Sequence, residues 1–179
     1  MPGEHQHENR TPRKRYVQLS LLVWVAMIGI DFFLHGGIFA TTYTQDSPFL
    51  LSAMESFRRI PFGYLALLIT TGLLVWIIDQ ASVRGWRKGL TLGFCLGAVI
   101  GASFTFGLYS ISTAHPQLLA TWFVAQLLEI AVAGAIIGEG LLVKSLRKLT
   151  IGVVIGFILL FAVTIVLQSV GLAPSIKIG

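Results

Sequence analysis

Charged residues are scarce in this chain: of its 179 residues, 12% are charged and 55% are hydrophobic. A soluble domain carries about 25% charged residues. The shortage excludes an ordinary soluble domain and indicates a chain whose surroundings are mostly lipid. Cysteine is nearly absent as well, since Cys95 is the only one. An internal disulfide and a metal cluster built from cysteines are therefore excluded.

Signatures of catalysis and of phosphate binding are also missing. The sequence contains no HExxH or GxSxG motif and no glycine-rich phosphate loop. We therefore expect a protein that is not an enzyme and has no catalytic residues. The net charge of +5 would suit nucleic acid, but the basic residues lie at the ends of apolar runs, as membrane topology requires. We expect no nucleic-acid partner, and the composition points to no particular cofactor.

Five long apolar runs dominate what the chain does contain. A helix crosses the bilayer with about 20 mostly apolar residues, and lipid offers the backbone no hydrogen bonds, so a span must be a helix or part of a closed barrel. The sequence predicts an all-α integral membrane bundle of five transmembrane helices in one domain, 16–173. A disordered basic tail is expected over 1–15 and a short outer tail over 174–179. The helices are expected at 16–40, 62–78, 89–112, 118–143 and 149–173.

The distribution of lysine and arginine predicts the orientation. If the helices alternate in direction, three basic residues fall on one side of the membrane: Arg58, Arg59 and Lys177. The side that holds more lysine and arginine is normally cytoplasmic. We therefore expect the N-terminus inside, the C-terminus outside and a location in the bacterial inner membrane. Ten basic residues fall on the expected inner side: Arg10, Arg13, Lys14, Arg15, Arg84, Arg87, Lys88, Lys144, Arg147 and Lys148.

The first outer loop, about 41–61, has the chemistry of a helix start. Asp46 or Ser47 is a suitable N-cap, and Pro48 suits the first helical position. Apolar residues then recur at helical spacing from Phe49 to Phe57. We expect a short amphipathic helix that lies on the outer face of the membrane or caps the bundle.

Glycines recur four residues apart in three of the expected helices. Small residues at this spacing let two helix backbones approach closely. The rows leave two interpretations open: packing within one bundle, or dimerisation of two chains. The helix-packing glycines are Gly93, Gly97, Gly101, Gly134, Gly138, Gly152 and Gly156.

Two acidic residues, Asp31 and Glu129, lie well inside apolar runs. Each costs about 2.5–3.5 kcal/mol at the centre of a membrane helix, and such residues usually face the protein interior. Asp31 and His35 are four residues apart and share a helix face, as do Gln126 and Glu129. At about 1.5 Å per residue, the two acids differ by only about 3 Å in depth. We expect an intramembrane polar cluster of Asp31, His35, Gln126 and Glu129, with Ser103 from the third helix at the same level.

Such a cluster has three possible roles. A carboxyl and a histidine can share a proton, two carboxylates and an imidazole can bind a metal ion, and the same groups can form a purely structural network. The separation of the Asp31 and Glu129 carboxyls distinguishes a joint site from separate local features. Below about 6 Å the groups interact strongly once desolvated.

Two stretches, "DFFLHG" at 31–36 and "WFVAQLLEIAVAGAIIG" at 122–138, resemble a group of small bacterial multi-pass membrane proteins of uncharacterised function. That group has Asp-x-x-x-His-Gly in the first helix and a Trp-Phe…Glu…Ala-Gly…Gly pattern in a late helix. The resemblance implies that the two polar faces belong to one motif set, and it implies no activity. Most members end after four helices, so the fifth helix and the basic tail depart from the pattern.

Three functions follow as hypotheses. The first is a non-enzymatic multi-pass membrane protein that stands alone, forms a homodimer or serves as an accessory subunit of a larger membrane complex. The second is a small proton- or cation-linked transporter with Asp31 and Glu129 as its charged pair, although five helices do not divide into inverted repeats. The third is a metal- or cofactor-binding membrane protein that uses His35.

Overall fold

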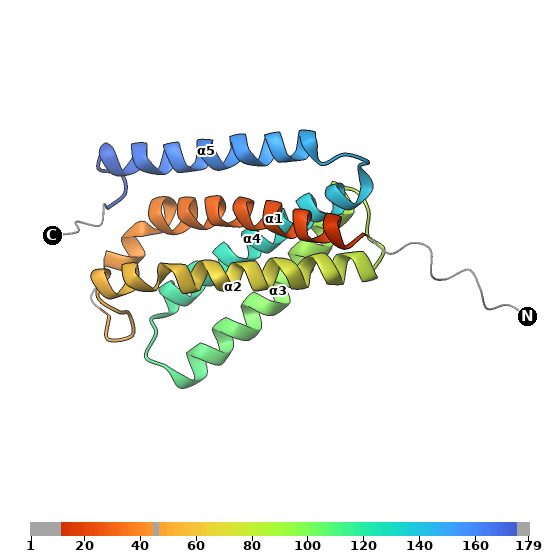
Figure 1. Ribbon diagram of the computed structural model, residues 1–179. Coiled ribbons are helices and arrows are strands. Elements are labelled where there is room, and N and C mark those ends of the chain that lie inside the picture. The colour runs from red at the N-terminus through yellow and green to blue at the C-terminus, as the bar shows by residue number, and fades with distance from the viewer. Residues whose placement is uncertain (1–11, 45–46, 175–179) are drawn as a thin grey trace, which may run out of the picture.

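A computed structural model describes residues 12–44 and 47–174, and all regular structure within them is helical (Figure 1). Five helices in this part of the chain are long and apolar enough to cross a membrane. The predicted all-helical membrane bundle is confirmed. The elements are α1 (Arg13–Phe33), a π-helical turn η1 (Leu34–Ile38), a 3₁₀ turn η2 (Ala40–Thr44), α2 (Ala53–Gln80), α3 (Trp86–Ile111), α4 (Pro116–Leu142) and α5 (Arg147–Ser169).

The helices α1 and α4 hold the bundle together. Helix α1 packs against α2, α4 and α5, while α3 packs mainly on α4. Successive helices run in opposite directions, so α1 begins and α5 ends at opposite ends of the bundle (Figure 1). The outward sides of α3 and α5 carry large exposed apolar side chains, as helices surrounded by lipid require. The core combines Leu19, Val23 and Met27 of α1, Leu74, Val75 and Ile78 of α2, and Ile130, Ala133 and Ile137 of α4.

Local hydrogen bonds fix where the helices begin and end. Ser52 caps α2, since its Oγ accepts from the Glu55 amide at 3.3 Å and donates to Glu55 Oε2 at 3.0 Å. At the C-terminus of α4, the Arg15 guanidinium donates to the carbonyls of Gly140 (2.5 Å), Val143 and Lys144 (3.1 Å). A cation at this position also opposes the partial negative charge of the helix end. Arg15 therefore ties the first helix to the fourth.

The predicted amphipathic helix does not form as a separate element. Residues 47–52 are turn and loop, and the helix begins at Ala53, after the Ser52 cap, rather than at Ser47 or Pro48; Asp46 lies outside the described residues. Helix α2 then continues through Pro61 to Gln80. Membrane helices tolerate proline because neighbouring groups satisfy the freed backbone positions. The apolar residues around Phe57 are thus the first turns of a membrane span.

The other helix bounds differ by a few residues. Helix α1 begins at Arg13, so residues 13–15, which were expected in the tail, belong to the helix. Residues 1–11 and 175–179 lie outside the described part. Helix α5 ends at Ser169 rather than 173 because Gly171 adopts a φ of +77°. There the Leu172 amide donates to the Leu167 carbonyl at 2.9 Å, a pattern that terminates helices around a glycine.

Glycines bring α3 and α4 into backbone contact. A Cβ added at Gly93 would lie 2.5 Å from the Ile130 carbonyl oxygen, and one at Gly138 would lie 2.6 Å from the Gly85 carbonyl oxygen. A Cβ at Gly134 would collide with the Gly89 carbonyl oxygen. We call this contact the glycine seam; it contains Gly89, Gly93, Gly97, Gly101, Gly134 and Gly138. The predicted rows on these two helices therefore pack within one chain.

The glycine row of α5 behaves differently. A Cβ at Gly152 or Gly156 would have no atom of this chain within 4 Å, so the expectation that these two glycines pack in the bundle is wrong. Helix α5 instead meets α1 through aromatic residues: the rings of Phe32 and Phe161 stack with centroids 4.7 Å apart. Its glycines point away from that contact.

Candidate functional site

Asp31 and His35 are positioned by an irregular end of the first span. Asp31 lies in the last turn of α1, and His35 lies in the π-helical turn η1. In this turn the Phe39 amide donates to the Leu34 carbonyl, five residues back, at 2.7 Å. His35 Nε2 lies 3.7 Å from Asp31 Oδ1. Single π turns occur frequently at functional sites, which directs attention to the chemistry around these two side chains.

Glu129 of α4 joins the pair from across the bundle. One ligand atom each from Asp31, His35 and Glu129 lie within 4.8 Å of one another. The two carboxyls are thus closer than the separation of about 6 Å that marks strong interaction after desolvation. The match in depth expected from the sequence corresponds to a real convergence of side chains. We call these three residues the DHE cluster.

A hydrogen-bond chain supports His35 from the turn that follows the first span. Tyr43, in η2, shares a hydrogen bond of 2.5 Å between its hydroxyl and His35 Nδ1, and Trp122 Nε1 donates to the same hydroxyl at 2.8 Å. Burial raises the pKa of the Tyr43 phenol above its usual range. The hydroxyl therefore stays neutral and holds the imidazole with its Nε2 toward Asp31.

Sequence reasoning missed Tyr43. It lies in a loop, where helical periodicity gives no information about direction. The signal available was indirect: Trp122 shares a helix face with Gln126 and Glu129, so its indole N–H needs a partner near the cluster. Only the return of the loop over the end of α1 shows which residue supplies it.

Neither Gln126 nor Ser103 forms a hydrogen bond with the three residues in the described part of the chain. Gln126 Oε1 lies 3.6 Å from where a Cβ would stand on Gly101, so this side chain borders the glycine seam. Within the described residues, no hydrogen bond links Gln126 to the DHE cluster. Ser103 is exposed. The expectation that it belongs to the polar cluster is wrong because it lies on the opposite side of α3. It follows the buried Gly101 by two residues, about 200° around the helix, and so faces away from α4.

The burial of the DHE cluster is uneven. Glu129 is only 5% exposed, whereas the side chains of Asp31 and His35 keep 30% and 26% of their surface. The Oε1 atom of Glu129 is buried and has no hydrogen-bond partner in the described part of the chain. The cluster is thus shielded from the surroundings at Glu129 and partly exposed at Asp31 and His35.

These groups suit a proton or a metal cation. Two carboxylates this close repel each other in a low-dielectric environment unless a proton or cation compensates the charge. An imidazole with two carboxylates is a common ligand set for divalent transition metals. Ligands about 2.1 Å from one ion lie at most about 4.2 Å apart, so small side-chain movements would complete a site. Tyr43 then acts on His35 as an outer-shell partner of the kind that orients metal ligands.

Comparison with known proteins gives no family for this chain. No protein-family model matches it, and no curated protein or solved structure matches it. The resemblance to small bacterial multi-pass proteins stays a prediction from the motifs around Asp31 and Glu129. The described residues form five helices that are long and apolar enough to cross a membrane, and the DHE cluster lies between the end of the first span and α4.

Proposed function

We propose that this protein is a proton-linked cation transporter of the bacterial inner membrane, in which a proton and a divalent metal cation compete for the DHE cluster. The observation that carries the proposal is the convergence of Asp31, His35 and Glu129 within 4.8 Å around a buried Glu129 oxygen without a hydrogen-bond partner. Metal ligands must be deprotonated before they bind. Uptake of a metal ion at this cluster therefore releases protons, which links the two ions chemically.

A purely structural network explains the contacts less well. In a structural network every buried polar atom is satisfied, because an unpaired one is costly in a low dielectric. Here the Glu129 Oε1 atom is unpaired, and the 3.7 Å between His35 and Asp31 is longer than a hydrogen bond. Membrane helices rarely retain ionisable groups without a functional use.

The uneven burial supports exchange with the surroundings. Asp31 and His35 are partly exposed while Glu129 is buried, so the cluster is closed on the Glu129 side and accessible on the side of Asp31 and His35. With the basic end of the bundle in the cytoplasm, the cluster lies in the outer half of the membrane. Because a bundle of five helices has little room for a central pathway, we expect the working unit to be a homodimer or a larger membrane complex.

Transport by purified protein in liposomes tests the proposal. The chain is reconstituted with a pH-sensitive dye inside, and Zn²⁺, Mn²⁺ or Co²⁺ is added outside with and without a pH gradient. We expect the wild type to move at least one of these cations together with a pH change, and Asp31→Asn and Glu129→Gln to abolish both signals. Glu55→Gln is the matched control, since it removes an exposed carboxyl at the start of α2. Wild-type liposomes that move neither protons nor these cations would contradict the proposal.

The variant Tyr43→Phe tests the role of the Tyr43 hydroxyl, which contacts His35, separately from the roles of the three proposed ligand residues. The variant keeps the ring and removes the hydroxyl that holds His35. Loss of such a partner typically lowers metal affinity about 10- to 100-fold, so half-saturating cation concentrations should rise by that factor while transport persists. Unchanged cation affinity in this variant would argue against a role for His35 as a ligand.

A further inference from the structure

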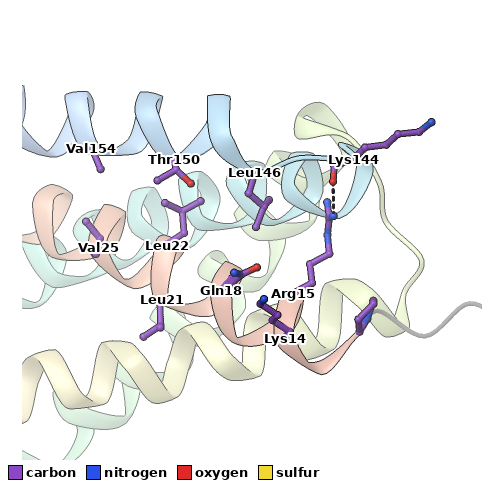
Figure 2. Close-up of a pocket in the computed structure, with 11 residues that line it drawn as sticks. Lys14, Arg15, Gln18, Leu21, Leu22, Val25, Lys144, Leu146, Thr150 and Val154 are labelled. Carbon is purple, nitrogen blue, oxygen red and sulfur yellow. Dashed lines mark hydrogen bonds between the residues drawn. The ribbon is translucent and has the colours of Figure 1, made fainter.

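A second feature lies at the other end of the bundle, away from the DHE cluster. A pocket of about 720 Å³ opens between α1 and α5 near their basic ends. Figure 2 shows Leu22 and Val25 of α1 directed toward α5, and Thr150 and Val154 of α5 directed back toward α1. We call this pocket the α1–α5 groove.

The groove exists because the two helices touch over only part of their length. Toward the outer end, Gly29 lets Phe157 approach, and a Cβ there would stand 2.9 Å from the Phe157 ring. The stacked rings of Phe32 and Phe161 extend this contact. Toward the start of α1, the facing side chains are smaller and the helices leave the groove open between them.

The mouth of the groove is basic and its charge is not compensated within the described chain. Lys14, Arg15 and Lys144 line it, and the two lysines are exposed. Among residues 12–44 and 47–174, the ion pairs join only His35 to Asp31 and Arg84 to Asp79. Arg15 is engaged with the end of α4, as the dashed line to Lys144 in Figure 2 marks. The two exposed lysines thus give the mouth an uncompensated positive charge, although the Lys144 side chain extends away from the groove in Figure 2.

Below the mouth the lining becomes mostly apolar, with Leu21, Leu22 and Val25 of α1 facing Leu146 and Val154. The polar side chains of Gln18 and Thr150 also line it. At about 1.5 Å per residue, the apolar lining extends about 6 Å along α1 and about 12 Å from Leu146 to Val154, within the thickness of about 15 Å of half a hydrocarbon core. An occupant must therefore carry a negative head and an apolar tail that enters one leaflet.

We propose that the α1–α5 groove binds one anionic phospholipid, with its phosphate at the basic mouth lined by Lys14, Arg15 and Lys144 and an acyl chain along Leu22, Val25 and Val154. Basic pockets between membrane helices at the cytoplasmic side bind such headgroups. The lipid would fill the space that α1 and α5 leave between them and connect the two helices where they do not touch. This site is separate from the DHE cluster, so Asp31→Asn protein should retain the lipid.

Native mass spectrometry of the full chain from nanodiscs with equal parts phosphatidylglycerol and phosphatidylcholine tests this proposal. We expect wild-type protein to retain one phosphatidylglycerol in clear preference to phosphatidylcholine. Each lysine near an anionic surface contributes about fivefold in affinity, so Lys14→Gln combined with Lys144→Gln should reduce the preference more than about tenfold. The control pair Lys88→Gln with Lys148→Gln removes two basic residues of the same membrane side that do not line the groove.

A second pair of variants tests the acyl-chain path. Val154→Trp fills the groove and should expel the lipid, whereas Ile155→Trp places the same bulk on a neighbouring residue that is also exposed but does not line the groove. Equal retention of both lipids by the wild type would overturn the proposal, and so would equal lipid loss in the two lysine pairs or in the two tryptophan variants. A lipid-free dimer that Val154→Trp dissociates would assign the groove to a second copy of the chain instead.

Discussion

The α3–α4 pair and the α1–α5 pair both involve helices with glycines four residues apart, yet they pack in different ways. In the glycine seam the backbones touch, and a Cβ at Gly134 or Gly93 would meet backbone atoms of the facing helix. In the α1–α5 pair, the glycines of α5 face away and stacked phenylalanines make the contact. A row of small residues therefore permits close approach, but the rotation of the helix decides whether a partner uses it.

The largest effect should come from breaking the glycine seam. Gly134→Ala places a methyl group against the Gly89 carbonyl oxygen and 2.9 Å from Gly93 Cα. Backbone atoms cannot yield as a side chain can, so we expect the free energy of unfolding to fall by about 3 kcal/mol. Unfolding in detergent followed by circular dichroism measures it. Gly107→Ala is the control on α3, because a Cβ there meets nothing within 4 Å; equal effects of the two changes would refute the seam.

A smaller effect is expected at the α1–α5 contact. Gly29→Ala brings a Cβ to 2.9 Å from Phe157 Cδ2 and 3.3 Å from Phe157 Cα. The ring can rotate away while the backbone must shift slightly, so we expect a loss of about 1 kcal/mol. The same change made in a Phe157→Leu background should cost less, and a double-mutant cycle measures the difference. Simple additivity would mean that Gly29 and Phe157 do not compete for space.

The smallest effect, and one of opposite sign, is expected for the outward glycines of α5. Gly152→Ala and Gly156→Ala add a methyl group in open space and replace the poorest ordinary helix former, which should stabilise the protein by up to about 1 kcal/mol each. Thermal unfolding in detergent and in nanodiscs checks this. A destabilisation seen only in nanodiscs would reveal that a second chain packs on this row in the membrane.

Much of the fold was predictable because lipid restricts the possible structures. Five apolar runs had to become five helices, and the depth of Asp31 and Glu129 followed from counting residues along them. Depth does not determine rotation, however. Ser103 lies at the expected level but about 200° from the buried Gly101, and Gly152 and Gly156 face away from α1.

Loops and helix starts were harder to predict. The capping pair Ser52 and Glu55 competed with an equally plausible start near Ser47, and Pro61 suggested a boundary where the helix in fact continues. Tyr43 reaches His35 only because two short turns fold back over the end of α1. Hydrophobic periodicity carries no information about tertiary contacts, so it predicts neither the start of α2 nor the position of Tyr43.

The π-helical turn Leu34–Ile38 means that the first span contains one residue more than a regular α-helix of the same height. Removing Gly36 or Gly37 would restore regular hydrogen bonding and rotate everything beyond it by about 100°, carrying Tyr43 away from its place beside His35. The hydrogen bond that orients His35 therefore depends on chain length as well as on residue type. In a related chain, a one-residue gap at this turn would mark the loss of the Tyr43 contact even where the Asp, His and Glu of the cluster and the Tyr are all retained.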